Sequence, residues 1–195
     1  MSASPLRHIP NAITVARLLL VGPTAYFLWR SEYQLALVLM AVAGASDAID
    51  GWLARRFSWT SKLGGTLDPV ADKLLVGALF VVLTLQGHLP PWLVAIVVGR
   101  DAVIMAGAGV YRLLFSHLEL VPTFISKANT ALQIVLLLLF LLMLCDLPVV
   151  SDLSRRLVFP YGIALVAIVG VVSGLDYVVT WSRRAIHQAR ERGRV

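Results

Sequence analysis

The chain has few charged residues, a single cysteine and no clustered histidines. Only 14% of its 195 residues are charged and 58% are hydrophobic, whereas soluble domains carry about 25% charged residues. This shortage of charge excludes an ordinary soluble domain and predicts an integral membrane protein. The lone Cys145 cannot form an internal disulfide, and we expect it to act as apolar filler at the end of a leucine run.

The sequence also lacks internal repeats, low-complexity linkers and an evident cleavable signal. The first apolar segment carries Arg17 and has no obvious small-residue cleavage site, so we expect it to stay in the chain as a helix. The length fits one domain that covers residues 1–195.

Six apolar stretches are long enough to cross a bilayer, which takes roughly 20 mostly apolar residues in a helix. They cover residues 13–29, 33–55, 66–85, 91–115, 123–145 and 157–181. Charged residues, glycine and proline separate them at 30–32, 58–65, 87–91 and 146–156. The fold class we predict is therefore an all-α integral membrane protein, a bundle of six transmembrane helices. The basic tail after Trp181 is expected to be an interfacial helix or a frayed end.

Basic residues gather in alternate loops, which sets the orientation. With the N-terminus in the cytoplasm, the inside segments hold Arg7, Arg55, Arg56, Lys62, Arg112, Lys127, Arg183, Arg184, Arg190, Arg192 and Arg194, and the outside holds Arg30, Arg155 and Arg156. We therefore predict a bacterial inner (plasma) membrane protein with both termini in the cytoplasm. Anionic membrane lipids explain the net charge of +6 better than nucleic acid does, so no nucleic-acid partner is expected.

Four aspartates stand near the predicted cytoplasmic ends of the second and third spans. Their pattern is Asp47-x-x-Asp50-Gly51-x-x-Ala54-Arg55, then eight residues, then Gly64-x-x-x-Asp68-x-x-x-Asp72. The first set follows one stripe of a helix, and the second pair shares one face of the next helix. Because only a short basic loop joins the two helices, both acidic faces can meet in one active site at the cytoplasmic surface.

Four neighbouring carboxylates in a low dielectric would repel one another unless cations join them. Oxygen ligands suit hard ions, so we predict one or two Mg²⁺ or Mn²⁺ ions, which would activate a phosphoryl group. Arg55 can fork onto phosphate oxygens, and Asp72 can accept a proton from an attacking hydroxyl. The alternatives are structural: an isolated aspartate in a membrane helix often pairs with Arg or Lys, and Asp68 before Pro69 resembles a helix N-cap.

This pattern resembles the signature of the CDP-alcohol phosphotransferases, in order and in spacing. The resemblance covers nearly the whole chain and includes Ile9-Pro10-Asn11. It implies six helices around a cytoplasm-facing polar cavity, in an enzyme that is usually a homodimer. It also implies that metal held by Asp47, Asp50, Asp68 and Asp72 binds the diphosphate of a CDP-diacylglycerol donor, and that the donor contacts Pro10, Asn11, Gly51, Arg55 and Ser61. Asp72 would be the general base, and CMP would leave.

The acceptor depends on a finer resemblance. Residues 122–133, with Arg100-Asp101, are similar to eukaryotic-type cardiolipin synthases, which use the anionic phospholipid phosphatidylglycerol. The alternative is phosphatidylglycerophosphate synthase, which takes glycerol 3-phosphate and typically has Arg-Glu at that position. Small apolar residues over 102–110 favour a lipid acceptor.

Three cations are candidates for the acceptor's phosphate: Arg100, Arg112 and Lys127. Arg100 could instead pair with Asp101 or another buried carboxylate, and the other two could be interfacial anchors. Polar residues at 129, 130 and 133 could bond helix to helix, and Asp176 is expected to have a structural partner.

A divalent metal transporter is the rival from a different class, because it too would place carboxylates in helices. Transporters more naturally hold such groups near the midplane of the bilayer, between broken helices. The clustering at one membrane face favours the enzyme.

Overall fold

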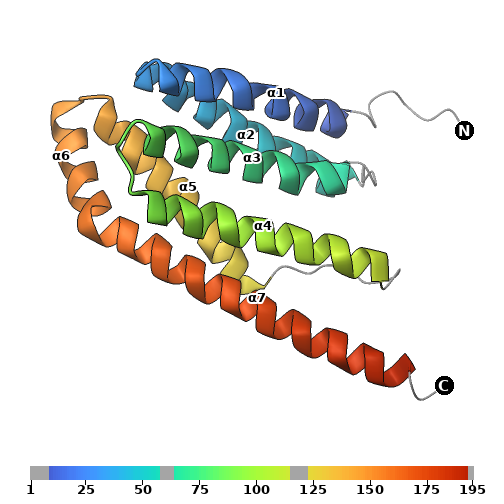
Figure 1. Cartoon of the computed structure of the whole chain (residues 1–195). Coiled ribbons are helices and arrows are strands. Elements are labelled where there is room, and N and C mark those ends of the chain that lie inside the picture. The colour runs from blue at the N-terminus through green and yellow to red at the C-terminus, as the bar shows by residue number, and fades with distance from the viewer. Residues whose placement is uncertain (1–8, 58–63, 115–122, 193–195) are drawn as a thin grey trace, which may run out of the picture. The chain divides into compact units, whose positions relative to one another are not determined.

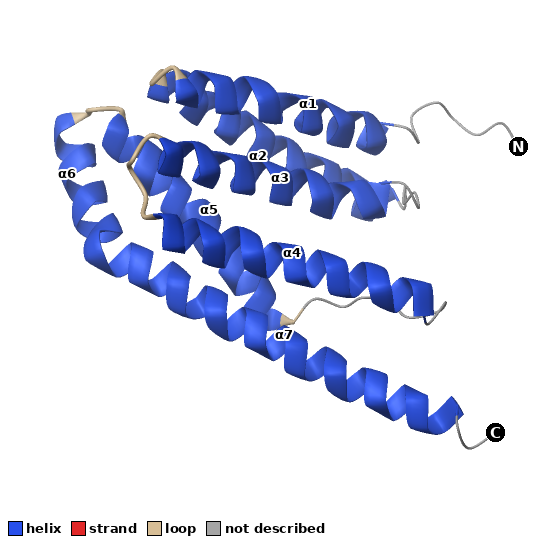
Figure 2. Cartoon of the chain, in the orientation of Figure 1, coloured by secondary structure: helices blue, strands red, loops and turns tan. Residues whose placement is uncertain are grey.

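The computed structural model describes residues 9–57, 64–114 and 123–192, and helices make up nearly all of this part of the chain (Figures 1 and 2). In chain order these are α1(Ile9–Trp29), α2(Tyr33–Phe57), α3(Gly64–Leu85), α4(Pro91–Leu114), α5(Phe124–Leu144), α6(Pro148–Leu157), the π-helical turn η2(Val158–Gly162) and α7(Ile163–Arg192). No strand occurs in those three ranges.

Each predicted span corresponds to a long helix, and α1 to α5 begin and end within a few residues of the expected positions. Four stretches of the described chain are long and apolar enough to cross a membrane: Ala12–Trp29, Tyr33–Trp52, Phe124–Leu144 and Val149–Arg183. These features fit an all-α membrane protein. The count of six spans and the cytoplasm-facing cavity remain predictions.

The segment 146–156 separates the fifth and sixth apolar stretches as expected, because α5 ends at Leu144, but most of the segment is a ten-residue helix, α6, rather than irregular chain. Its charged residues lower the hydropathy that marks a span, but they do not prevent a short amphipathic helix. The last long helix also starts later than predicted, at Ile163, because the non-helical backbone of Phe159 before Pro160 interrupts it. It then continues to Arg192, so the basic residues after Trp181 are helical up to that point, whereas their placement at the membrane interface stays a prediction.

Three left-handed residues end helices at the expected breaks. Ser31, Gly87 and Asp146 have φ of 60°, 78° and 57° and follow α1, α3 and α5. After α3, the amide of Gly87 donates to the carbonyl of Thr84, and that of His88 donates to Leu83. Such bonds satisfy the last carbonyls of a helix.

The described chain forms two compact units, each with its own core. Unit 1 comprises residues 1–90 and 137–156, and in it α1 packs against both α2 and α3. Leu28, Ala43, Phe80 and Phe140 are among its fully buried side chains. Unit 2 comprises residues 91–136 and 157–195, and in it α7 packs along α4.

Large apolar side chains are exposed along most of the long helices. Leu19, Trp92, Ile168 and Leu175 are each more than half exposed. An aqueous surface would not favour so much apolar area, whereas lipid tails accommodate it.

Candidate active site

Helix geometry brings Arg17, Asp47 and Asp72 to similar depths in unit 1. At one end, the side-chain amide of Gln86 donates to the carbonyl of Leu28 at 2.9 Å, which ties the end of α3 to the end of α1. Arg17 lies 11 residues before Leu28, and Asp72 lies 14 residues before Gln86. At 1.5 Å per residue, these positions are roughly 17 and 21 Å from that end. Asp47, 14 residues into α2 from the neighbouring turn, reaches the same depth.

The side chain of Arg17 is the centre of this cluster. Its Nη1 lies 2.8 Å from Oδ1 of Asp47 and 3.0 Å from Oδ1 of Asp72. Its Nη2 donates to Oδ2 of Asp50 at 2.5 Å. One guanidinium from α1 therefore joins two carboxylates of α2 to one of α3.

Burial differs among the four side chains. Arg17 is 1% exposed and Asp50 is 5% exposed, whereas Asp47 is 48% and Asp72 is 36% exposed. The Arg17–Asp50 pair thus forms the buried side of the cluster, and the carboxylates of Asp47 and Asp72 are exposed on its open side. This gradient suits a site that is anchored on one side and receives a ligand on the other.

The central cation was missed by the sequence reasoning, which placed Arg17 only within a helix. A signal existed, because an arginine inside an apolar span is costly and needs a partner within the membrane. The pairing expected of an isolated aspartate is therefore present, but it joins three aspartates to one arginine rather than making separate pairs.

The metal-binding role stays a prediction. Within the described residues, no group of three or more acidic, histidine or cysteine side chains is arranged to hold an ion directly. The side chain of Asp68, the fourth predicted ligand, lies outside the described part of the chain. The ligand chemistry of the site nevertheless suits a divalent ion, because three carboxylates meet there and carboxylate oxygens are the ligands that hard divalent ions prefer.

The structure describes only some of the residues that are predicted to contact the donor. Gly51 is half-buried in α2, one residue after Asp50. Pro10 and Asn11 belong to the first turn of α1, and Arg55 belongs to the last turns of α2, but their side chains lie outside the described part. Ser61 lies outside the described residues altogether.

Arg100, the first candidate for the acceptor, is buried in unit 2 and engages three neighbours. Its Nη1 lies 2.5 Å from Oδ1 of Asp101. Its Nη2 donates to the hydroxyls of Ser126 in α5 and Ser173 in α7, at 2.6 and 2.7 Å. The pairing with Asp101, one of the two alternatives, is therefore observed, and Arg100 joins three helices of this unit.

The other two acceptor candidates differ in what the structure describes. Lys127 is exposed near the start of α5, and the side chain of Arg112 lies outside the described part. Their contact with an acceptor stays a prediction.

Two buried side-chain amides, those of Asn129 and Gln133, lie on one face of α5. Asn129 and Gln133 are fully buried, and neither side chain has a hydrogen-bond partner within the described ranges. The hydroxyl of Thr130 donates to the carbonyl of Ser126 in its own helix. The prediction that these two amides bond helix to helix is therefore wrong. Oδ2 of Asp176, for which a structural partner was expected, also has no hydrogen-bond partner among the described residues. Unit 2 thus has a polar interior that its own described residues do not satisfy.

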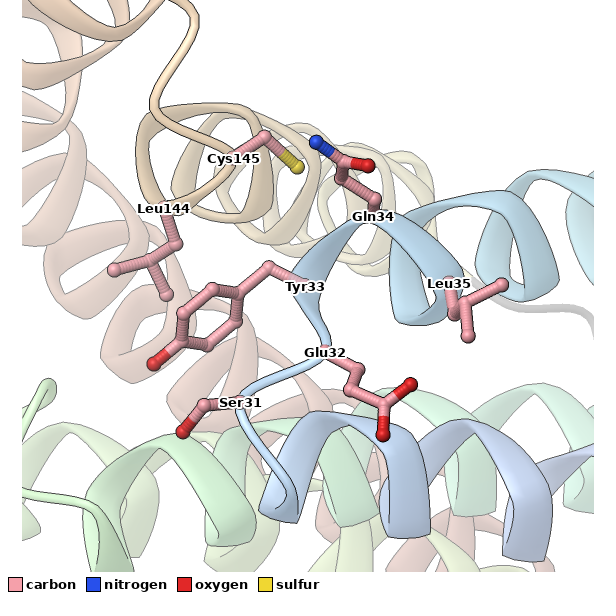
Figure 3. A pocket seen from close by; sticks show the side chains of 7 residues that line it. All are labelled: Ser31, Glu32, Tyr33, Gln34, Leu35, Leu144 and Cys145. Atoms are coloured by element: carbon pink, nitrogen blue, oxygen red, sulfur yellow. The ribbon is translucent and has the colours of Figure 1, made fainter.

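A separate cavity of about 350 Å³ lies at the other end of α2 (Figure 3). The turn at 31–35 lines it together with Leu144 and Cys145. Tyr33 and Asp47 are 14 residues apart, or about 21 Å along a helix. The lining contains Glu32 and no cation, so this cavity does not suit a phosphate group.

Comparison with known proteins identifies the family of this chain. The family profile of CDP-alcohol phosphatidyltransferases matches residues 7–181. The chain therefore belongs to the CDP-alcohol phosphatidyltransferase family, as the spacing of the aspartates predicted.

The similar proteins are named either as cardiolipin synthases or as phosphatidyltransferases that act on glycerol 3-phosphate. The chain is 38% identical over 142 residues to the "Probable cardiolipin synthase (CMP-forming)" of Drosophila melanogaster, covering 65% of this chain and 44% of that protein. It is 35% identical over 144 residues to the human cardiolipin synthase (CMP-forming), covering 66% and 48%. It is 42% identical over 105 residues to the CDP-diacylglycerol–glycerol-3-phosphate 3-phosphatidyltransferase of Pseudomonas fluorescens, covering 51% and 53%. The chain spans about half the length of these relatives.

Proposed function

We propose that this protein is a cardiolipin synthase of the CMP-forming type, which transfers a phosphatidyl group from CDP-diacylglycerol to phosphatidylglycerol. The observation that carries the proposal is the meeting of Asp47, Asp50 and Asp72 around one guanidinium in unit 1. Family membership supports the CDP-linked donor, and the relatives named as cardiolipin synthases support the acceptor.

In the proposed reaction, a hydroxyl of phosphatidylglycerol attacks the phosphorus on the lipid side of the donor diphosphate. A new bond forms between that oxygen and phosphorus, and the bond to the CMP oxygen breaks. Asp72 accepts the hydroxyl proton, because its carboxylate is partly exposed at the open side of the cluster. CMP leaves with the electron pair of the broken bond.

Asp47, Asp50, Asp68 and Asp72 would hold one or two Mg²⁺ or Mn²⁺ ions. When bound, such ions polarise the phosphoryl group and neutralise the leaving phosphate. Gly51 would let the nucleotide lie close to α2, while Pro10, Asn11, Arg55 and Ser61 would contact the donor. The homodimer, the bacterial inner membrane and the cytoplasmic active site belong to the same proposal.

A lipid acceptor is favoured by the surface of α4. Val103 and Met105, which follow the Arg100-Asp101 pair, are 48% and 44% exposed. An apolar wall suits acyl chains better than it suits glycerol 3-phosphate. Transfer to glycerol 3-phosphate is the second candidate, because the P. fluorescens relative is named for it.

The continuity of α2 and α3 argues against a metal transporter. In transporters of this kind, ions bind where helices are interrupted. Here α2 continues through Asp47 and Asp50, and α3 continues through Asp72.

The acceptor is tested with the purified protein, CDP-diacylglycerol and Mn²⁺. We expect CMP release and cardiolipin, identified by mass, when phosphatidylglycerol is supplied, and little product with glycerol 3-phosphate, serine or inositol phosphate. Product from glycerol 3-phosphate alone would establish the second candidate. No CMP with any acceptor, together with Mn²⁺ flux into vesicles, would favour the transporter.

Replacement of the exposed Lys127 by alanine tests the acceptor side. If its ammonium binds the acceptor's phosphate, Lys127→Ala should raise the KM for phosphatidylglycerol by about tenfold, the effect of losing about 1.4 kcal/mol of binding. The KM for the donor should change little. Arg155→Ala, which removes an exposed arginine of α6, serves as the matched control. Equal changes in both KM values would contradict the assignment.

A further inference from the structure

Arg17 occupies the position that a cation shared by two helices would take. Its Nη1 lies within 3.0 Å of an oxygen of Asp47 and an oxygen of Asp72, which belong to α2 and α3. These two oxygens are therefore no further apart than the sum of the two distances. A single ion that joined them would take the place of Nη1 and would need the two oxygens within about 4.2 Å of each other, because Mg²⁺ binds oxygen at about 2.0–2.1 Å.

The charge of the cluster also leaves room for a second cation. Three carboxylates against one guanidinium give these four side chains a formal charge of −2. The buried Arg17–Asp50 pair fixes one side of the cluster, while Asp47 and Asp72 are the more exposed members. A divalent ion could thus reach the two outer carboxylates, but it would meet the positive charge already placed between them.

We propose that Arg17 is a positioning residue that acts as an internal counter-cation: it holds the three carboxylates together before metal binds and competes with the metal for Asp47 and Asp72. This inference rests on the metal site of the proposed function. It adds that metal affinity is set partly by an arginine of α1, outside the aspartate motif. Metal binding then requires Nη1 to withdraw from the outer carboxylates, while Nη2 can stay on Asp50.

The test compares Mn²⁺ binding by the full-length protein and by Arg17→Gln, both purified in detergent and freed of metal. Free Mn²⁺ is followed by electron paramagnetic resonance during titration with Mn²⁺ alone, and the thermal unfolding midpoint is recorded in parallel. Without metal, Arg17→Gln should unfold at a lower temperature, because the carboxylates lose their shared partner. It should bind Mn²⁺ about tenfold more tightly, a typical size for coupling between two binding events. It should also gain more in unfolding temperature at saturating Mn²⁺.

Arg17→Lys is the second variant and keeps the positive charge. Because one ammonium cannot reach three carboxylates as a planar fork does, its Mn²⁺ affinity should lie between those of the wild type and Arg17→Gln. It provides the comparison if Arg17→Gln does not fold. Arg30→Gln, which removes an exposed arginine just after α1, is the matched control and should bind Mn²⁺ as the wild type does.

Unchanged or weaker Mn²⁺ binding in both Arg17 variants would overturn the competition. In that case wild-type Mn²⁺ binding and CMP release would remain, so the proposed function would stand. Absence of Mn²⁺ binding in the wild type itself would overturn the metal site and this inference together.

Discussion

Replacement of Asp72 by asparagine should reduce CMP release by about a thousandfold, within the range for loss of a general base. Asparagine has nearly the same shape as aspartate but cannot accept the proton of the attacking hydroxyl. Its amide oxygen can still accept the hydrogen bond that Arg17 donates to Asp72. We therefore expect the fold and donor binding to be largely kept while turnover is lost.

Turnover is measured as CMP formed in single-turnover reactions with saturating donor and Mn²⁺. Donor binding is measured separately, as the rise in unfolding temperature that CDP-diacylglycerol produces. Asp152→Asn makes the same chemical change at an exposed position of α6 and should leave both quantities unchanged. Substantial turnover by Asp72→Asn would show that another group takes the proton.

The helices were largely predictable because their signals are local. Apolar runs of the right length set α1 to α5, and glycine, proline and charged residues marked where they end. The short helix α6 was missed because Asp152, Arg155 and Arg156 make it too polar to be recognised as a span. The kink at Phe159 was missed because it interrupts an otherwise continuous apolar run.

The site was predictable only in part, because helix periodicity describes one helix at a time. The spacing of Asp47 and Asp50 predicts a shared face, and the short loop predicts that Asp72 can approach them. The spacing does not say which side chain of another helix lies between them, and that is Arg17. Similarly, Asn129 and Gln133 share a face by spacing, but only the structure describes them as buried without partners among its residues.

Replacement of Asp50 by alanine should lower the free energy of unfolding much more than replacement of Asp47, although both aspartates belong to the same sequence motif. Asp50 is 5% exposed and is bonded to a fully buried arginine. Removing one partner of a buried ion pair costs about 3–5 kcal/mol, because the remaining charge loses its compensation. Asp47 is 48% exposed, and loss of such a contact costs about 0–1 kcal/mol.

Without metal, Asp50→Ala should therefore unfold on the order of 10 °C below the wild type, whereas Asp47→Ala should unfold within a few degrees of it. With Mn²⁺ and CDP-diacylglycerol added, both variants should lose much of the stabilisation that the wild type gains, because each has lost a predicted metal ligand. Asp50→Asn is the control for shape, since its amide oxygen can still accept the bond from Nη2 of Arg17, and it should be more stable than Asp50→Ala. Equal unfolding temperatures for Asp47→Ala and Asp50→Ala would mean that the Arg17–Asp50 pair does not anchor the cluster.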